Sequence, residues 1–167
     1  MFHNSLRAES IRSLNILLVP PSDWLTHPLL SRLHYIFEDL ARRHTVYVVW
    51  FMLNTWGTSA RQTKARLLPI RTVFTGDMSV NNLLSVPLVT SSINSLLKRE
   101  TIDVVVASNI LPALIASRLA QRKGIPCIFD YHDHFPDSAT LYYQLAPAKQ
   151  IVREIVDMVV SMSIRTC

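Results

Sequence analysis

Short, continuous apolar runs alternate with helical patterns along this chain, and this alternation constrains its fold more than any other feature. Residues 14–19 and 102–107 lack the polar alternation of a half-exposed strand, which predicts strands buried on both faces. Residues 29–43 instead repeat apolar side chains every three or four positions, as an amphipathic helix does. The pattern predicts an α/β fold, a Rossmann-like three-layer α/β/α arrangement with a mostly parallel sheet of about six strands.

The expected elements cover most of the chain. We expect residues 1–13 to be an N-terminal extension and residues 14–167 to form one Rossmann-like domain. Binding residues gather beyond the carboxyl ends of parallel strands, which directs attention to residues 20–27 and 130–137. Strands are predicted at 14–19, 45–52, 67–74, 102–107, 126–129 and 157–162, helices at 29–43, 88–98, 109–123 and 148–155, a helix or excursion at 54–65, and irregular structure at 81–87.

Composition excludes several classes of protein. Hydrophobic residues make up 49% of the 167 residues and charged residues 17%, which suits a folded core and excludes a disordered chain. Gly57, Gly76 and Gly124 are far apart, whereas glycine-rich phosphate loops need clustered glycines. The net charge of +5 suits anionic partners, but no recognition motif indicates nucleic-acid binding.

Cysteine usage and hydropathy indicate the compartment. Cys127 and Cys167 are too few for a disulfide framework or a four-cysteine zinc site; we expect Cys127 to be a core residue and Cys167 to be frayed. Such sparse usage is typical of a reducing compartment. Because the sequence shows neither a signal peptide nor a membrane span, a cytoplasmic location is predicted, with peripheral contact at the inner face of the membrane as an option.

The densest group of chemically active side chains runs from Asp130 to His134 (DYHDH). On an extended backbone, Asp130, His132 and His134 would point one way and Tyr131 and Asp133 the other. Three readings are open. The segment is a solvated loop in which Asp130 caps a turn, a metal site in which His-x-His and a carboxylate bind zinc, or a recognition site for a hydroxylated ligand. We favour the third, because imidazole and carboxylate together supply donors and acceptors for sugar hydroxyls.

Five motifs occur in a familiar order: ILLV at 16–19, LARRHTVYVV at 40–49, DVVVAS at 103–108, KGIP at 123–126 and DMVVS at 157–161. In this order and spacing the chain resembles the N-terminal half of a GT-B glycosyltransferase. The similarity is to the large retaining group that uses nucleotide-sugar donors, glycosyltransferase family 4-like. It extends over nearly the whole chain from residue 14.

The resemblance implies a two-domain enzyme whose active site lies in the cleft between two Rossmann-like halves. This chain corresponds to the acceptor-side half, and we expect the C-terminal donor-binding half to be absent from it and the chain alone to be inactive. The resemblance implies His132 and Asp133 as candidate catalytic residues, with His132 touching the donor sugar. No cofactor or metal is expected. The candidate substrate-binding residues are Ser22, Asp23, Trp24, Asp130 and His134.

Two aromatic and basic features leave alternatives open. Trp24 either stacks on a sugar ring or packs its loop onto the following helix. The basic residues Arg61, Lys64, Arg66 and Arg71 either form a solvated face or hold the protein at an anionic membrane, which would suit a lipid-linked acceptor.

The sequence therefore favours the acceptor-side domain of a glycosyltransferase that uses a nucleotide-sugar donor and an unknown hydroxylated acceptor. The alternatives are a metal-dependent hydrolase built on Asp130, His132 and His134, and a non-catalytic Rossmann-like binding module.

Overall fold

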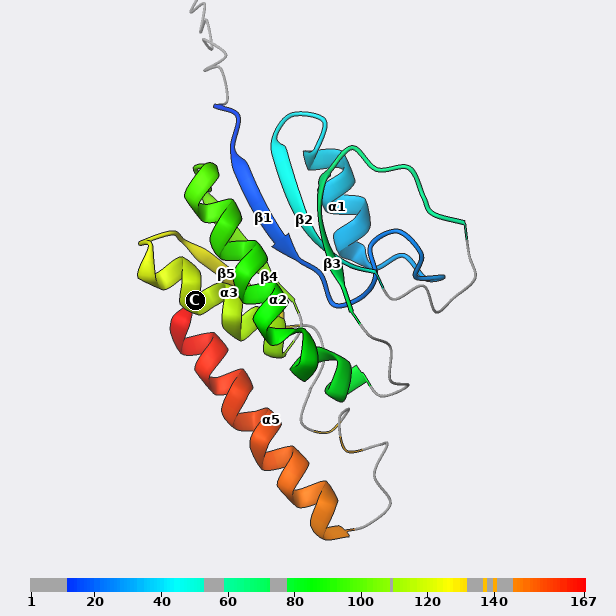
Figure 1. The fold of residues 1–167 in the computed structure, drawn as a ribbon, viewed down its shortest axis with the longest axis vertical. Helices are drawn as coiled ribbons and strands as arrows, with labels where there is room; N and C mark the ends of the chain where they lie inside the picture. Colours follow the sequence, from blue (N-terminus) through cyan, green and yellow to red (C-terminus); the bar gives the residue numbers. More distant parts are fainter. Residues whose placement is uncertain are drawn as a thin grey trace, which may run out of the picture.

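A computed structural model describes residues 12–52, 59–72, 78–108, 110–131, 137, 140 and 146–167, and it shows one parallel sheet flanked by helices (Figure 1). The strand order is β3-β2-β1-β4-β5, and every neighbouring pair is parallel. The predicted α/β fold is confirmed, with five strands in the described chain where about six were expected. The elements are β1 (Asn15–Val19), α1 (Arg32–Leu40), β2 (Thr45–Met52), β3 (Arg66–Arg71), α2 (Met78–Arg99), β4 (Val104–Ala107), α3 (Leu111–Arg122), β5 (Cys127–Phe129) and α5 (Ala146–Thr166).

The central strand β1 is buried on both faces along residues 16–19, as their continuous apolar sequence predicts. Leu17 and Val19 belong to the core between the sheet and helices α2 and α3. Ile16 and Leu18 alternate with them and belong to the core on the opposite face, beneath α1. The two faces of the sheet are thus covered by different helices, and α5 packs against α3 outside the sheet (Figure 1).

Two predictions about the helices are wrong. Residues 157–162, expected as a strand, continue α5, because Val159 and Ser163 are buried four residues apart on the helix face that packs toward α3. Residues 81–87, expected to be irregular, belong to α2 despite the proline at position 87. In α2 the buried side chains of Ser85, Val89 and Ile93 recur every four residues, so core contacts on one face outweigh the hydrogen bond that the proline removes.

The C-terminal end of the chain is tied to the sheet. Cys127 in β5 and Cys167 form a disulfide across 40 positions of sequence, with their Cα atoms 4.6 Å apart. The expectation of a core thiol and a frayed C-terminus is therefore wrong. Sequence spacing could not reveal this pair, because it depends on α5 folding back to return the chain to β5 (Figure 1). Gly124 directly follows the C-cap residue of α3 and has a φ of 66°, the left-handed conformation that commonly ends a helix.

Candidate functional site

The loop after β1 is organised by Asp23, one of the predicted substrate-binding residues. Its side chain is buried, and Oδ1 accepts hydrogen bonds from the backbone N–H groups of Leu25 (2.9 Å) and Thr26 (2.9 Å). The indole Nε1 of Trp50 donates a third hydrogen bond to the same oxygen, at 3.0 Å. A carboxylate that receives three donors holds the loop in one conformation. Asp23 thus shapes the loop, and its neighbour Ser22 is half-buried.

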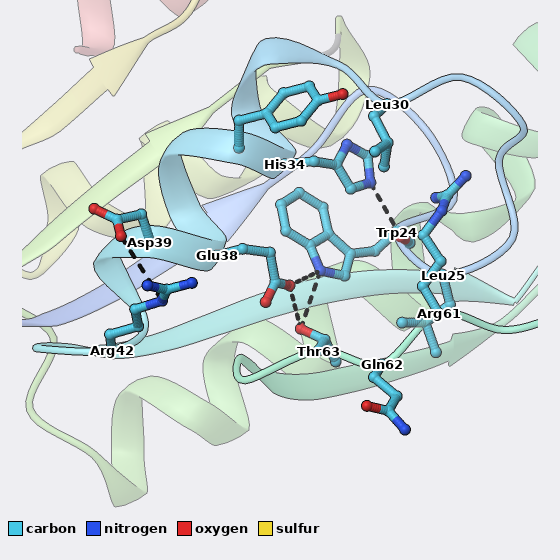
Figure 2. Close-up of a pocket in the computed structure, with 11 residues that line it drawn as sticks. Trp24, Leu25, Leu30, His34, Glu38, Asp39, Arg42, Arg61, Gln62 and Thr63 are labelled. Atoms are coloured by element: carbon cyan, nitrogen blue, oxygen red, sulfur yellow. Dashed lines mark hydrogen bonds and ion pairs between the residues drawn. The ribbon is translucent and has the colours of Figure 1, made fainter.

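Trp24 packs this loop onto α1. Its side chain is only 1% exposed, and its ring stacks on that of His34 with the ring centroids 4.0 Å apart. Its Nε1 donates to Glu38 Oε1 (3.1 Å) and Thr63 Oγ1 (3.4 Å), as Figure 2 shows. One face of the indole is covered by imidazole and its nitrogen is satisfied by protein groups. The structure therefore has the packing arrangement, one of the two alternatives that the sequence left open.

His34 is a buried polar residue that the sequence did not identify as part of this loop's support. Its Nε2 lies 3.0 Å from the carbonyl oxygen of Trp24, and its Nδ1 accepts from the backbone N–H of Ser31 at 3.2 Å. Burial lowers the pKa of the imidazole below 6.5, so the ring is neutral at pH 7. The signal in the sequence was its position beside Leu33 and Phe37, on the buried face of α1.

Asp130 directly follows β5, and its side chain reaches the first residue of α1. Arg32 Nη2 donates to Asp130 Oδ1, and the backbone N–H of Asp130 donates to the carbonyl oxygen of Ala107 at 2.8 Å. The ion pair borders a cavity of about 310 Å³ that Pro21 and Leu33 also line. Sequence reasoning placed both loops at the carboxyl ends of strands but missed Arg32, which joins them.

The remaining predicted site residues cannot be placed. His132, Asp133 and His134 lie outside the described residues. Within the described ranges, no three histidine, cysteine or acidic side chains form a group that could hold a metal ion. No helix in that same part of the chain is long and apolar enough to cross a membrane.

A parallel sheet in this strand order, with a cavity at its carboxyl end, is a Rossmann-like domain. A family model described as Glycosyltransferase Family 4 matches residues 31–165, and the chain belongs to this family. The resemblance inferred from the sequence motifs is thereby confirmed, and the chain is an N-terminal domain of the GT-B type. No curated protein sequence matches the chain.

Two solved structures are similar to this chain. One, described as the glycotransferase of kitacinnamycin, is 19% identical, with a TM-score of 0.52 over 91% of this chain and 41% of that one. Another is Arabidopsis thaliana UGT89C1 complexed with UDP, 16% identical, with a TM-score of 0.49 over 80% of this chain and 38% of that one. The chain thus spans about two fifths of the length of these structures.

Proposed function

We propose that this chain is the acceptor-side domain of a glycosyltransferase that transfers a sugar from a nucleotide-sugar donor to a hydroxylated acceptor. The observation that carries the proposal is the Arg32–Asp130 ion pair at the carboxyl end of the sheet, in a domain that belongs to Glycosyltransferase Family 4. The pair connects the β1 loop with the start of the segment that contains His132 and Asp133. Those two residues are the proposed catalytic groups.

Charge and exposure support a binding role at this end of the sheet. The Arg32 side chain is 57% exposed and uses one of its two terminal nitrogens on Asp130, so the guanidinium retains donors that face solvent. Asp130 is 16% exposed and anchors that guanidinium. Ser22 and His134 would complete the acceptor side, while Asp23 and Trp24 hold the loop in shape.

A second half would bind most of the donor. The chain has no clustered glycines to approach a phosphate, and it spans only 41% of the first similar structure. In this proposal His132 reaches the donor sugar from the acceptor side, and the nucleotide is held by the other Rossmann-like half.

We also propose a lipid-linked acceptor and peripheral contact with the inner face of the membrane. Leu29 and Leu30, which precede α1, and Ile36 within it are exposed apolar side chains, and Arg42 and Arg43 follow the helix, where both pair with Asp39. Exposed apolar groups within basic surroundings suit an anionic lipid surface. The domain should sediment with anionic vesicles and dissociate as salt rises, because the attraction is screened over about 8 Å at physiological ionic strength. Equal binding to neutral vesicles would contradict the membrane proposal.

The test of the transfer proposal uses the polypeptide of the complete reading frame that contains this chain. Release of nucleoside diphosphate is measured with UDP-, GDP- and ADP-sugars. His132→Ala should lower kcat/KM by roughly 10²-fold, the scale of one lost transition-state interaction. His44→Ala is the matched control, because His44 precedes β2 at the amino end of the sheet, where its Nδ1 accepts from the Leu14 N–H at 3.2 Å. Unchanged kinetics in His132→Ala would remove that residue from the site.

A further inference from the structure

A second cavity, of about 320 Å³, lies between α1 and residues 61–63 (Figure 2). Its lining shares no residue with that of the cavity beside the Arg32–Asp130 pair. Trp24, Leu25 and His34 form its buried wall. Glu38 fixes one side, since its Oε1 accepts from Trp24 Nε1 and from the Thr63 hydroxyl and its Oε2 accepts from the backbone N–H of residue 64 at 3.1 Å. The cavity is therefore held open by groups whose hydrogen bonds are already made.

The rim, in contrast, carries polar groups that face solvent. Tyr35 is 66% exposed, and Gln62, which also lines the cavity, is exposed as well. A phenol and an amide can each both donate and accept a hydrogen bond. Arg42 and Asp39 stand beside them, and their Nε–Oδ1 distance of 3.8 Å is too long for a hydrogen bond. These four groups are therefore the ones that a ligand would meet first.

The charges around the cavity balance. Two basic residues, Arg42 and Arg61, face two acidic residues, Glu38 and Asp39. His34 adds no charge at pH 7, because burial lowers its pKa. A phosphate or another anion would therefore gain no net attraction here, whereas a neutral molecule with many hydroxyl groups could use donors and acceptors of both kinds.

We propose that this cavity binds a single saccharide unit of the acceptor, an inference that rests on the proposed function. A pyranose ring is neutral, and its hydroxyl groups both donate and accept, which matches the balanced charges and the Tyr35 and Gln62 groups of the rim. Its C–H groups suit the exposed apolar side chain of Leu30 and the exposed ring of Tyr35. The volume lies at the lower end of the range for small-molecule sites, so it fits one ring rather than a chain.

The experiment titrates the ¹⁵N-labelled chain of 167 residues with methyl glycosides of glucose, mannose, galactose and N-acetylglucosamine. The indole N–H resonance of Trp24 reports on the cavity wall, and that of Trp50, which donates to Asp23, is the internal reference. At least one glycoside should shift the Trp24 resonance saturably, with a Kd in the millimolar range, and leave the Trp50 resonance in place.

Two variants with the same chemical change decide where the glycoside binds. Gln62→Ala should raise the Kd at least fivefold, whereas Gln121→Ala, an exposed glutamine on α3, should leave it unchanged. Both positions are exposed, so thermal unfolding should match that of the parent chain. Tyr35→Phe should also weaken binding, through loss of the hydroxyl alone.

Three results would overturn the inference: no saturable shift with any glycoside at tens of millimolar, an equal Kd for Gln62→Ala and the parent chain, or tighter binding of inorganic phosphate than of every glycoside. The titration contains no nucleotide and no transfer step. A negative titration would therefore contradict glycoside binding without contradicting the transfer proposal. Likewise, absence of transfer in the complete enzyme would not contradict glycoside binding.

Discussion

Arg32, the first residue of α1, donates a hydrogen bond to Asp130, which follows β5, although 98 positions separate the two residues in the sequence. The pair joins the start of α1 to the segment that follows β5, at the carboxyl edge of the sheet. Because both side chains keep contact with solvent, the ion pair contributes little to the free energy of unfolding, even though it positions the proposed site.

We expect a double-mutant cycle on this pair to give a coupling energy of about 0.2–1 kcal/mol in the free energy of unfolding. The variants are Arg32→Ala, Asp130→Ala and the combination, measured by urea denaturation. In the complete enzyme, Arg32→Ala should lower kcat/KM by roughly tenfold, the effect of a misplaced site. Additive unfolding energies would show that the ion pair is not made in solution.

Much of the fold could be predicted from the sequence, because strands that are buried on both faces appear as short runs of apolar residues. Residues 16–19 and 104–107 are apolar without interruption because the sheet is covered on both faces, and they form most of β1 and all of β4. The prediction failed where local preference and packing disagree. The valines at 159 and 160 favour a strand, but packing against α3 keeps them in a helix.

For the candidate site, the sequence could predict the location but not the contacts between its residues. The sequence indicated the ends of β1 and β5, and the structure brings these ends together. The pattern did not indicate Arg32, because its ion pair with a residue 98 positions away exists only after folding. His34 could be assigned to the buried face of α1, but its stacking on Trp24 could not be foreseen for the same reason. The same holds for the cavity between α1 and residues 61–63.

The buried imidazole of His34 should make stability depend on pH. Its pKa is lowered from 6.5, chiefly by burial, so the unfolded chain takes up a proton at a higher pH than the folded protein does. The stabilisation is complete above pH 6.5 and is lost as the pH falls from there to the lower pKa of the folded state.

We therefore expect the free energy of unfolding to decrease as the pH falls from about 7.5 to about 5.5, a window that brackets the ordinary pKa of histidine. The decrease should be smaller in His34→Gln over the same window. Denaturant unfolding at fixed ionic strength measures it. His44→Gln, before β2 at the amino end of the sheet, is the control and should follow the parent chain. An identical pH profile for His34→Gln would contradict the assignment.

The Cys127–Cys167 disulfide should contribute to stability by closing a loop of 40 residues. In the chain-entropy account such a loop stabilises the folded state by about 4 kcal/mol. Reductant should therefore lower the unfolding free energy of the parent chain by that order and leave a Cys127→Ser/Cys167→Ser variant unaffected. Two reactive thiols per chain, found by titration of the denatured protein without reductant, would show that the bond is not formed.

The last prediction concerns the donor: this chain alone should bind nucleotide-sugars only weakly and transfer no sugar. It has no clustered glycines to cradle a diphosphate, and the exposed guanidinium of Arg32 is shared with Asp130. One or two hydrogen bonds from His132 and its neighbours contribute about 1 kcal/mol each after exchange with water. Association costs several kcal/mol in lost translation and rotation, so these contacts fall short of micromolar affinity.

Calorimetric titration of the folded chain with UDP-, GDP- and ADP-sugars measures the affinity directly. Micromolar binding of any of them would place a complete donor site within these 167 residues and would contradict the division of labour between two halves.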